Sequence, residues 1–205
     1  MTNVAVIYYS STGNVYQLAQ EAAQAAEKAG AEVRLRKCAE LAPAAVVAGK
    51  KEWAEHTEAT AHIETASLDD LEWADVLLFG TPTRFGLPAA QLKQFIDTAG
   101  GLWFQHKLEN KVVSSFTSTS TQHGGQESTL LALNNTFYHW GAIIVAPGYA
   151  DEVQFGHTNG NPYGTSSVSN HGHSGPTEEN LAAIAFQARR SVEIASALKR
   201  GFESA

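Results

Sequence analysis

Cysteine is almost missing from this sequence, since Cys38 is the single one among 205 residues. One thiol cannot close a disulfide within the chain, which is typical of proteins in a reducing compartment. The first residues also lack the basic region with which a secretion signal begins. We therefore expect a cytoplasmic protein in which Cys38 is a small buried apolar residue.

Long apolar runs and an excess of positive charge are missing as well. No stretch approaches the roughly 18 to 20 apolar residues that a membrane-spanning helix needs. The 14 Lys and Arg face 21 Asp and Glu, so the net charge is −7 and the pI is about 5.6. Such a balance repels nucleic-acid phosphates in bulk, although it leaves room for a local anion site. We expect neither a membrane span nor a nucleic-acid partner.

Apolar residues are plentiful, at 43% of the chain, which is enough to bury a core. Short apolar or alternating runs predict strands, and apolar residues at helical spacing predict helices. The expected strands are 4–9, 32–36, 75–80, 111–116 and 141–146, and the expected helices are 15–29, 89–99, 128–140 and 177–200. This alternation predicts one domain over residues 1–205 with a doubly wound α/β fold. We expect a five-stranded parallel sheet in the order 2-1-3-4-5, with helices on both faces.

Two segments exceed a minimal version of this fold. Residues 43–66 form an insertion rich in Ala and charge, with an expected helix near Val46–His56. Residues 151–176 form a second insertion rich in Gly, Asn, Ser and His, and loops of this length are usually functional or disordered. Composition leaves open whether the second insertion covers a site or packs on a neighbouring subunit. His171 and His173 lie there without a nearby carboxylate or cysteine, so we expect no metal site.

The loop after the first strand has the composition of an anion site. It consists of Ser10, Ser11, Thr12, Gly13 and Asn14. In an α/β sheet this position offers free backbone N–H groups and the positive end of a helix dipole, and a glycine lets the backbone close around a phosphate. The same residue types also suit an ordinary helix start, so the loop alone leaves both interpretations open.

Other nucleotide motifs are missing from the chain. It contains no Gly-x-Gly pair, which excludes the dinucleotide fingerprint, and no Gly-x-x-x-x-Gly-Lys, which excludes a P-loop. These absences favour a mononucleotide. Two further polar loops, 81–86 and 117–127, are expected at the same sheet edge, where strand order reverses and ligands bind.

Several of these segments resemble a known family. Residues 10–14 resemble the phosphate loop of flavodoxins, while residues 80–86, 100–103, 124–127 and 162–164 resemble the WrbA family. The resemblance runs from about residue 3 to 200. It implies a flavodoxin-like fold and an FMN-dependent NAD(P)H:quinone oxidoreductase. It further implies one FMN per subunit and a homotetramer whose active sites lie near subunit contacts.

The resemblance also assigns site residues. The FMN phosphate is expected at Ser10, Ser11, Thr12, Gly13, Asn14 and Val15. The flavin ring is expected at Pro82, Thr83, Arg84, Phe85 and Gly86, and the third FMN loop supplies Ser118, Thr119, Ser120, Thr121 and Gly124. His139 is expected next to the flavin and Trp103 in the quinone pocket. The sequence departs from the family at Thr12, where many relatives carry a tyrosine, and at Gln122-His123, where relatives are richer in glycine.

The implied chemistry is carried by the flavin, which can accept a hydride from NADH or NADPH and reduce a quinone in a ping-pong sequence. His139 is then the candidate to hydrogen-bond or protonate the quinone oxygen, although a histidine at a helix end is often only a C-cap. Trp103 is a candidate stacking wall or a packing residue. Two alternatives remain: a one-electron carrier like flavodoxin, and a regulatory protein that binds FMN as a structural ligand.

Overall fold

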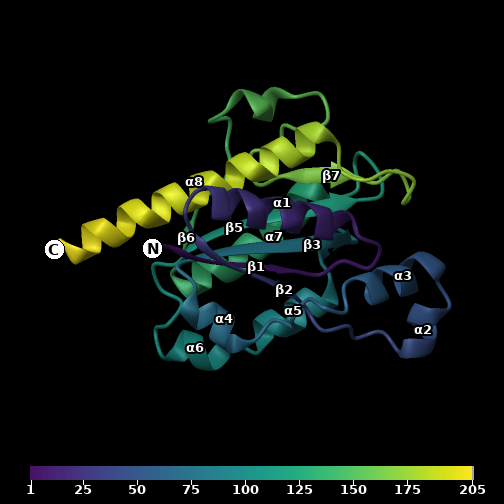
Figure 1. Ribbon diagram of the computed structural model, residues 1–205, viewed down its shortest axis with the longest axis horizontal. Coiled ribbons are helices and arrows are strands. Elements are labelled where there is room, and N and C mark those ends of the chain that lie inside the picture. Colours follow the sequence, from purple (N-terminus) through teal and green to yellow (C-terminus); the bar gives the residue numbers. More distant parts are fainter. Residues whose placement is uncertain (205) are drawn as a thin grey trace.

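In a computed structural model that describes residues 1–204, a twisted sheet lies between two layers of helices (Figure 1). The central path of the sheet is β2 (Glu32–Lys37), β1 (Asn3–Tyr8), β3 (Val76–Arg84), β5 (Val112–Thr119) and β6 (Ile143–Ile144). Neighbours along this path are parallel. The expected α/β fold with a parallel sheet and helices on both faces is thus confirmed.

The expected count of five strands is wrong, because the sheet has seven in the described residues 1–204. β4 (Leu87–Pro88) runs antiparallel to the end of β3. β7 (Ser166–Val168) pairs with the carboxyl half of β5, while β6 pairs with its amino half. Two short strands therefore share the place of the expected fifth strand, and β6 covers only two of the residues predicted at 141–146.

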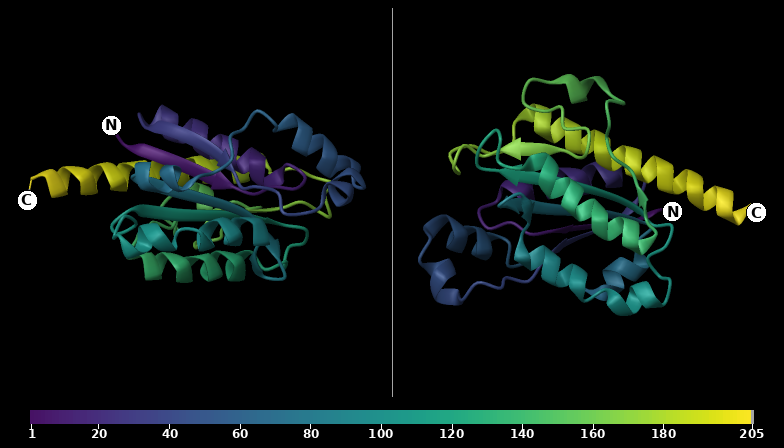
Figure 2. Two further views of the ribbon diagram at one scale, coloured as in Figure 1. Left: turned by 90° about the horizontal axis from the view of Figure 1, so that it is seen from below. Right: turned by 180° about the vertical axis from the view of Figure 1, so that it is seen from behind.

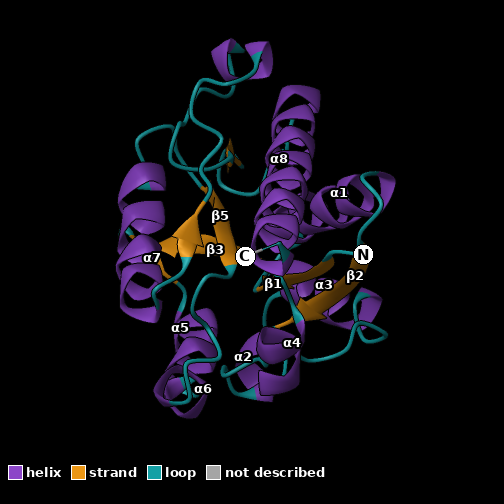
Figure 3. Ribbon diagram, turned by 90° about the vertical axis from the view of Figure 1, so that its left-hand side faces the viewer, coloured by secondary structure: helices purple, strands orange, loops and turns teal. Residues whose placement is uncertain are grey.

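Each face of the sheet has its own apolar core. α1 (Asn14–Lys28) and α8 (Glu178–Glu203) cover one face, and α4 (Leu68–Trp73), α5 (Ala90–Asp97), α6 (Gly100–Phe104) and α7 (Gln126–Trp140) cover the other (Figures 2 and 3). Along β1, Val4 and Val6 belong to the first core and Ala5 and Ile7 to the second. A strand buried on both faces needs an uninterrupted apolar run, which explains the pattern seen in the sequence.

β3 and β5 run further than the sequence predicts. Thr81 and Pro82 pair with Thr117 and Ser118, so residues expected in loops belong to strands. β3 then turns at Phe85-Gly86 into β4, and both turn residues have positive φ, 55° and 80°. Positive φ at both central residues defines a type I′ turn, whose twist matches the twist of the two strands that it joins. Phe85 is an uncommon residue in this conformation.

The two insertions lie near the carboxyl ends of the strands. Residues 43–66 form two helices, α2 (Ala44–Ala48) and α3 (Lys51–Ala59), where a single helix was expected. They stand at the right-hand end of the molecule in Figure 1. The second insertion contains the 3₁₀ helix η1 (Glu152–Phe155) and β7. Both segments are therefore placed to contribute to a site at this edge of the sheet.

Candidate functional site

A pocket of about 240 Å³ opens at the carboxyl edge of the sheet, where the strand order reverses between β1 and β3. The loop after β1, the end of β3, the end of β5 and both insertions surround it. Its lining residues are Ser10, Ser11, Thr12, Asn14, Val15, Glu52, Pro82, Thr83, Arg84, Ser118, Thr119, Ser120, Ser169, His171 and Gly172. Residues from all three predicted loops thus meet at one place, as the topology requires.

The loop after β1 is shaped around Gly13. This residue precedes α1 with φ 101°, a conformation that glycine adopts without strain, and its N–H donates to Ser10 Oγ at 3.0 Å. The first turn of α1 contains no acidic residue that would occupy the positive end of the helix dipole. Asn14 Oδ1 is buried and has no hydrogen-bond partner among the residues that the structure describes. An unpartnered buried group of this kind costs stability, and at a helix start that lines a pocket it indicates a ligand-binding role.

Arg84, at the end of β3, is the one lysine or arginine of residues 1–204 that lines the pocket. The Arg84 guanidinium is exposed, donates to the Thr83 carbonyl oxygen at 2.9 Å and lies 3.5 Å from Ser11 Oγ. Thr83 Oγ1 is held by Thr129 Oγ1 of α7 at 2.7 Å. Pro82 and Thr83 therefore form a wall of the pocket, whereas the Arg84 head group lies exposed at its rim.

Phe85 and Gly86 do not line the pocket. They form the hairpin turn, and a methyl group placed on Gly86 would lie 2.9 Å from Ser128 Oγ of α7. The Phe85 side chain is fully exposed. Within one chain Gly86 lets the turn approach α7 closely, and the Phe85 ring contacts solvent.

The third loop divides into residues that line the pocket and residues that shape the loop. Ser118, Thr119 and Ser120 line the pocket. The Thr121 carbonyl oxygen accepts from Thr119 Oγ1 at 2.8 Å and from Gln126 Nε2 at 3.3 Å. Gly124 is needed for close approach, because a methyl group there would lie 2.8 Å from Thr119 Cβ. Thr121 and Gly124 thus act through the conformation of the loop.

Four lining residues come from the insertions and were not predicted as site residues. Glu52 comes from α3, and Ser169, His171 and Gly172 come from the second insertion. The pairing of β7 with β5 draws that insertion back to the pocket, and the His171 N–H donates to the Ser120 carbonyl oxygen at 3.1 Å. The strand Ser166–Val168 is the sequence feature that could have predicted this return of the insertion to the sheet. It is only three residues long and stands among Gly, Asn and Ser, which are typical of loops.

His139 and Trp103 lie together, but away from this pocket. His139 is in the last turn of α7, so helix geometry alone puts it about 20 Å from the start of that helix beside the third loop. Trp103 Nε1 donates to the His139 carbonyl oxygen at 2.8 Å, and both residues line a separate, open pocket of about 370 Å³ between α5, α6 and α7. Within one chain the structure does not bring them to the loop after β1.

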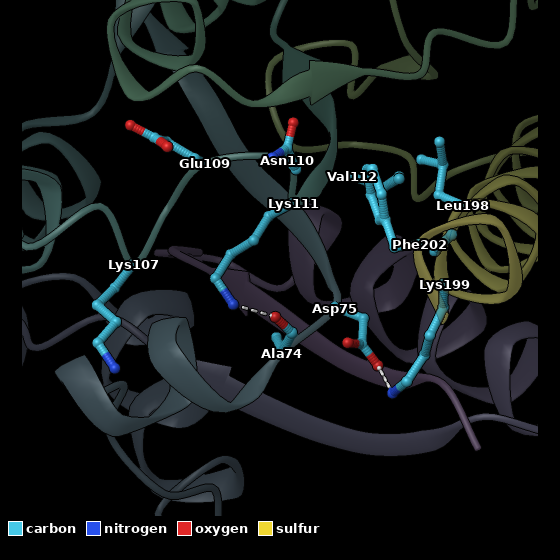
Figure 4. A pocket seen from close by; sticks show the side chains of 11 residues that line it. Ala74, Asp75, Lys107, Glu109, Asn110, Lys111, Val112, Leu198, Lys199 and Phe202 are labelled. Carbon is cyan, nitrogen blue, oxygen red and sulfur yellow. Dashed lines mark hydrogen bonds and ion pairs between the residues drawn. The ribbon is translucent and has the colours of Figure 1, made fainter. Parts of the chain in front are cut away.

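Another pocket of about 370 Å³ lies at the opposite, amino edge of the sheet (Figure 4). Its charged side chains all have partners, and two of these partners, Glu72 for Lys107 and His106 for Glu109, lie outside the lining. Lys111 Nζ donates to the carbonyl oxygens of Ala74 and Glu72, and Lys199 Nζ lies 3.1 Å from Asp75 Oδ2. Burial lowers the pKa of Lys111, and the Lys107 charge adds to this effect, while Asp75 and Glu72 oppose it. These groups tie α8 and α4 to the sheet.

Two kinds of feature are missing from residues 1–204, the part of the chain that the structure describes. In this part of the chain no three His, Cys, Asp or Glu side chains gather closely enough to hold a metal ion. None of its helices is both long and apolar enough to cross a bilayer.

Comparison with known proteins finds relatives along nearly the whole chain. A family model described as NADPH-dependent FMN reductase matches residues 2–155. A Deinococcus radiodurans protein named NAD(P)H dehydrogenase (quinone) is 48% identical over 196 residues, which cover 95% of this chain and 96% of that protein. A protein of the same name from Aromatoleum aromaticum is 42% identical over 204 residues, covering 97% of this chain and 98% of the relative.

The fold has close structural counterparts. A crystal structure described as a flavodoxin, WrbA-like protein from Agrobacterium tumefaciens has a TM-score of 0.67 at 23% identity, covering 96% of this chain and 98% of that one. A flavodoxin from the domain Archaea has a TM-score of 0.63 at 14% identity, with 95% and 99% covered. These likenesses confirm the flavodoxin-like fold, and the sequence relatives confirm the resemblance drawn from the motifs. The chain belongs to the NADPH-dependent FMN reductase family.

Proposed function

We propose that this protein is an FMN-dependent NAD(P)H:quinone oxidoreductase. One observation carries the proposal: three polar loops form a pocket with an unpartnered buried Asn14 Oδ1 at the carboxyl edge of a flavodoxin-like sheet. The pocket belongs to a chain that is 48% identical to a protein named NAD(P)H dehydrogenase (quinone). A cytoplasmic location and a single domain over residues 1–205 are part of the same proposal.

The chemistry of the pocket fits FMN. A phosphate needs donors and a positive helix end, which the hydroxyls of Ser11 and Thr12 and the start of α1 offer. A polyhydroxylated chain needs mixed donors and acceptors, which the hydroxyls of Ser118, Thr119 and Ser120 and the unpartnered Asn14 Oδ1 offer. Because Arg84 is at the rim, its charge can face the flavin ring, which becomes more negative on reduction.

Each group of residues has a role in this proposal. Residues 10–15 hold the phosphate of FMN. The flavin ring is held by Pro82, Thr83 and Arg84, and the polyhydroxylated chain that joins phosphate and ring is held by Ser118–Ser120. Thr121, Gly124, Phe85 and Gly86 set the loop shapes. Bound FMN supplies two-electron transfer from NADH or NADPH to a quinone. Because one open face serves both substrates, we expect ping-pong kinetics with no covalent nucleophile from the chain.

His139 and Trp103 serve this site from another copy of the chain. They lie about one α7 length from the pocket of their own chain, so they can stand beside a flavin only across a subunit contact. The α6–α7 side is apolar enough for such a contact: Trp103, Phe104, Leu131 and Tyr138 are all exposed there. The bond from Trp103 Nε1 to the His139 carbonyl oxygen holds the two residues as one unit. We propose a homotetramer in which the His139 imidazole moves a proton at the quinone oxygen.

The activity is tested by following NADH and NADPH consumption by purified protein with and without FMN and benzoquinone. Fast oxidation that requires both additions is the expected result. If FMN binds and NADH is not consumed, the protein is an electron carrier and the proposed enzyme activity is wrong. If FMN does not bind, the assignment of the pocket is wrong.

The contribution of a second copy is tested by mixing two inactive variants. Gly13→Val disables the FMN pocket, and His139→Ala removes the imidazole from the other end of the chain. If sites are built across subunits, oligomers formed from both variants regain part of the activity that each variant lacks alone. Light scattering gives the subunit number in the same samples. If mixed oligomers of confirmed composition regain no activity, His139 does not serve the site of a neighbouring subunit.

A further inference from the structure

The first insertion faces the loop after β1 with a histidine. α3 presents Glu52 and His56, four residues apart, on one side of the helix. Glu52 lines the pocket, and a methyl group placed on Gly13 would lie 3.5 Å from His56 Nδ1. The His56 ring also packs on Tyr16 of α1, with ring centroids 5.5 Å apart. An imidazole thus lies directly against the glycine around which the phosphate loop is formed.

The position of His56 is fixed by buried and half-buried anchors. The Glu40 carboxylate accepts from Trp53 Nε1 of α3 at 3.1 Å, from the Tyr9 hydroxyl at 2.8 Å and from Gln91 Nε2 of α5 at 2.7 Å. Lys37 Nζ donates to the Thr60 carbonyl oxygen at 2.6 Å. These contacts hold both ends of α3 on the sheet, so its inner face cannot turn away from the loop without breaking them.

The surroundings of His56 keep its ring neutral at pH 7 when no anion is present. Burial lowers the pKa of His56, and the nearby Lys37 charge lowers it further. A cavity of about 220 Å³ lies behind the ring, with Ser10 shared between this cavity and the pocket. The titratable groups that face His56 come from α1, β1, the end of β2 and α3 itself: Tyr16, Tyr8, Tyr9, Lys37, Cys38, Glu40 and Glu52. Tyr8, Tyr9 and Cys38 stay neutral, because burial raises the pKa of each of them.

We propose that His56 is a specificity-determining residue that favours FMN over riboflavin: it takes up a proton from solvent when a phosphate occupies residues 10–15, and the imidazolium charge then stabilises the phosphate. This inference rests on the proposed function. The loop carries no Lys or Arg, so a positive charge acquired on binding supplies what the loop lacks. Glu52, on the pocket side of α3, opposes the phosphate and makes the acquired charge more important.

The sign of the pH effect follows from linkage. An occupied phosphate site raises the pKa of His56, so FMN binding takes up a proton, and FMN affinity falls as the pH rises through the interval between the free and bound values. The phosphate has its own second ionisation near pH 6, which acts in the opposite direction. Riboflavin has no phosphate and therefore should not show the His56 effect.

The test measures the dissociation constants of FMN and riboflavin by flavin fluorescence from about pH 5.5 to 8.5. The proteins are wild type, His56→Gln and His62→Gln, which changes an exposed histidine of the same insertion. The ratio of the His56→Gln and wild-type constants cancels the ionisation of the phosphate. We expect this ratio to be about tenfold for FMN at the acid end and near one at the alkaline end. For riboflavin, and for His62→Gln with either ligand, it should stay near one.

A second measurement avoids any dependence on the variant's folding. Histidine resonances of the wild-type protein are titrated by NMR when free, with riboflavin and with FMN. The His56 signal should titrate at higher pH with FMN only. A flat ratio of constants, or a His56 titration unchanged by FMN, overturns the inference while FMN binding itself leaves the proposed function in place. If wild type binds no FMN, both fall together.

Discussion

The two edges of the sheet use polar residues in opposite ways. At the amino edge, each charged group around the larger pocket already has a partner, as Figure 4 shows for Lys111 and for the Asp75–Lys199 pair. At the carboxyl edge, the smaller pocket contains mostly neutral hydroxyls, a positive-φ glycine and an unpartnered Asn14 Oδ1. Pocket size therefore does not identify the site. What distinguishes the carboxyl-edge pocket is its position where the strand order reverses, together with neutral donors and an acceptor that no side chain already uses.

The largest expected effect is a loss of FMN affinity when the glycine before α1, but not the glycine after it, is replaced. Gly13 and Gly30 both have positive φ, 101° and 86°, and lie before and after this helix. Changing either to Ala strains the backbone and should cost about 1–2 kcal/mol of unfolding free energy. Only Gly13→Ala should also weaken FMN binding, by at least about tenfold, since Gly30 has no neighbour within 4 Å of a new methyl group. Denaturant unfolding and FMN titration check this, and equal FMN affinity in both variants would contradict the assigned loop.

At the amino edge, Lys111→Met should destabilise the protein by about 1–3 kcal/mol without changing FMN affinity. The substitution leaves the carbonyl oxygens of Glu72 and Ala74 without their donor. The pKa of Lys111 is lowered in the folded protein, so the folded chain loses this proton at a lower pH than the unfolded chain does. The unfolding free energy of the wild type therefore rises with pH, up to the ordinary pKa of lysine. Denaturant unfolding of both proteins between about pH 7 and 10 measures this rise. The stability gap should widen with pH; a constant gap would remove the titration from the explanation.

The smallest effect concerns two asparagines, one at each edge. Asn14→Leu removes the unpartnered Oδ1, so it should leave unfolding free energy unchanged or raise it by about 1 kcal/mol, while weakening FMN binding. Asn3 Nδ2 donates to the Trp73 carbonyl oxygen at 3.2 Å. Asn3→Leu should therefore lose about 1 kcal/mol and keep its FMN affinity. Thermal unfolding with and without FMN distinguishes the two, and the same response from both would show that the edges do not differ in function.

Most of the layered fold could be predicted because its signals are local. The apolar run of β1 and the helical spacing of α1 and α8 each reflect burial of that segment, and Gly13 marks a helix start. β4 and β7 escaped prediction because they are two and three residues long and exist through pairing with β3 and β5. Pairing partners are a property of the folded chain, so no window of sequence contains them.

Some residues of the site could likewise be predicted from the sequence, and others could not. Residues of the loop after β1 and the ends of β3 and β5 could be found, because topology brings the carboxyl ends of parallel strands together. Glu52 and His171 could not, since they reach the pocket from insertions whose path depends on anchors elsewhere. The distance of His139 from the pocket follows from the length of α7, but its meaning depends on a second copy of the chain, which a single sequence does not describe.

The Glu40 carboxylate has a consequence for how the molecule opens. Its two oxygens accept hydrogen bonds from Tyr9, Trp53 and Gln91 and from the backbone N–H groups of Leu41 and Ala42. Burial favours the neutral acid, but these bonds outweigh it and keep the pKa of Glu40 below its ordinary value. One anion thus joins the first insertion to two core elements. Amide hydrogens of α3 should exchange together, in a single local unfolding event that releases the whole insertion, instead of fraying one residue at a time.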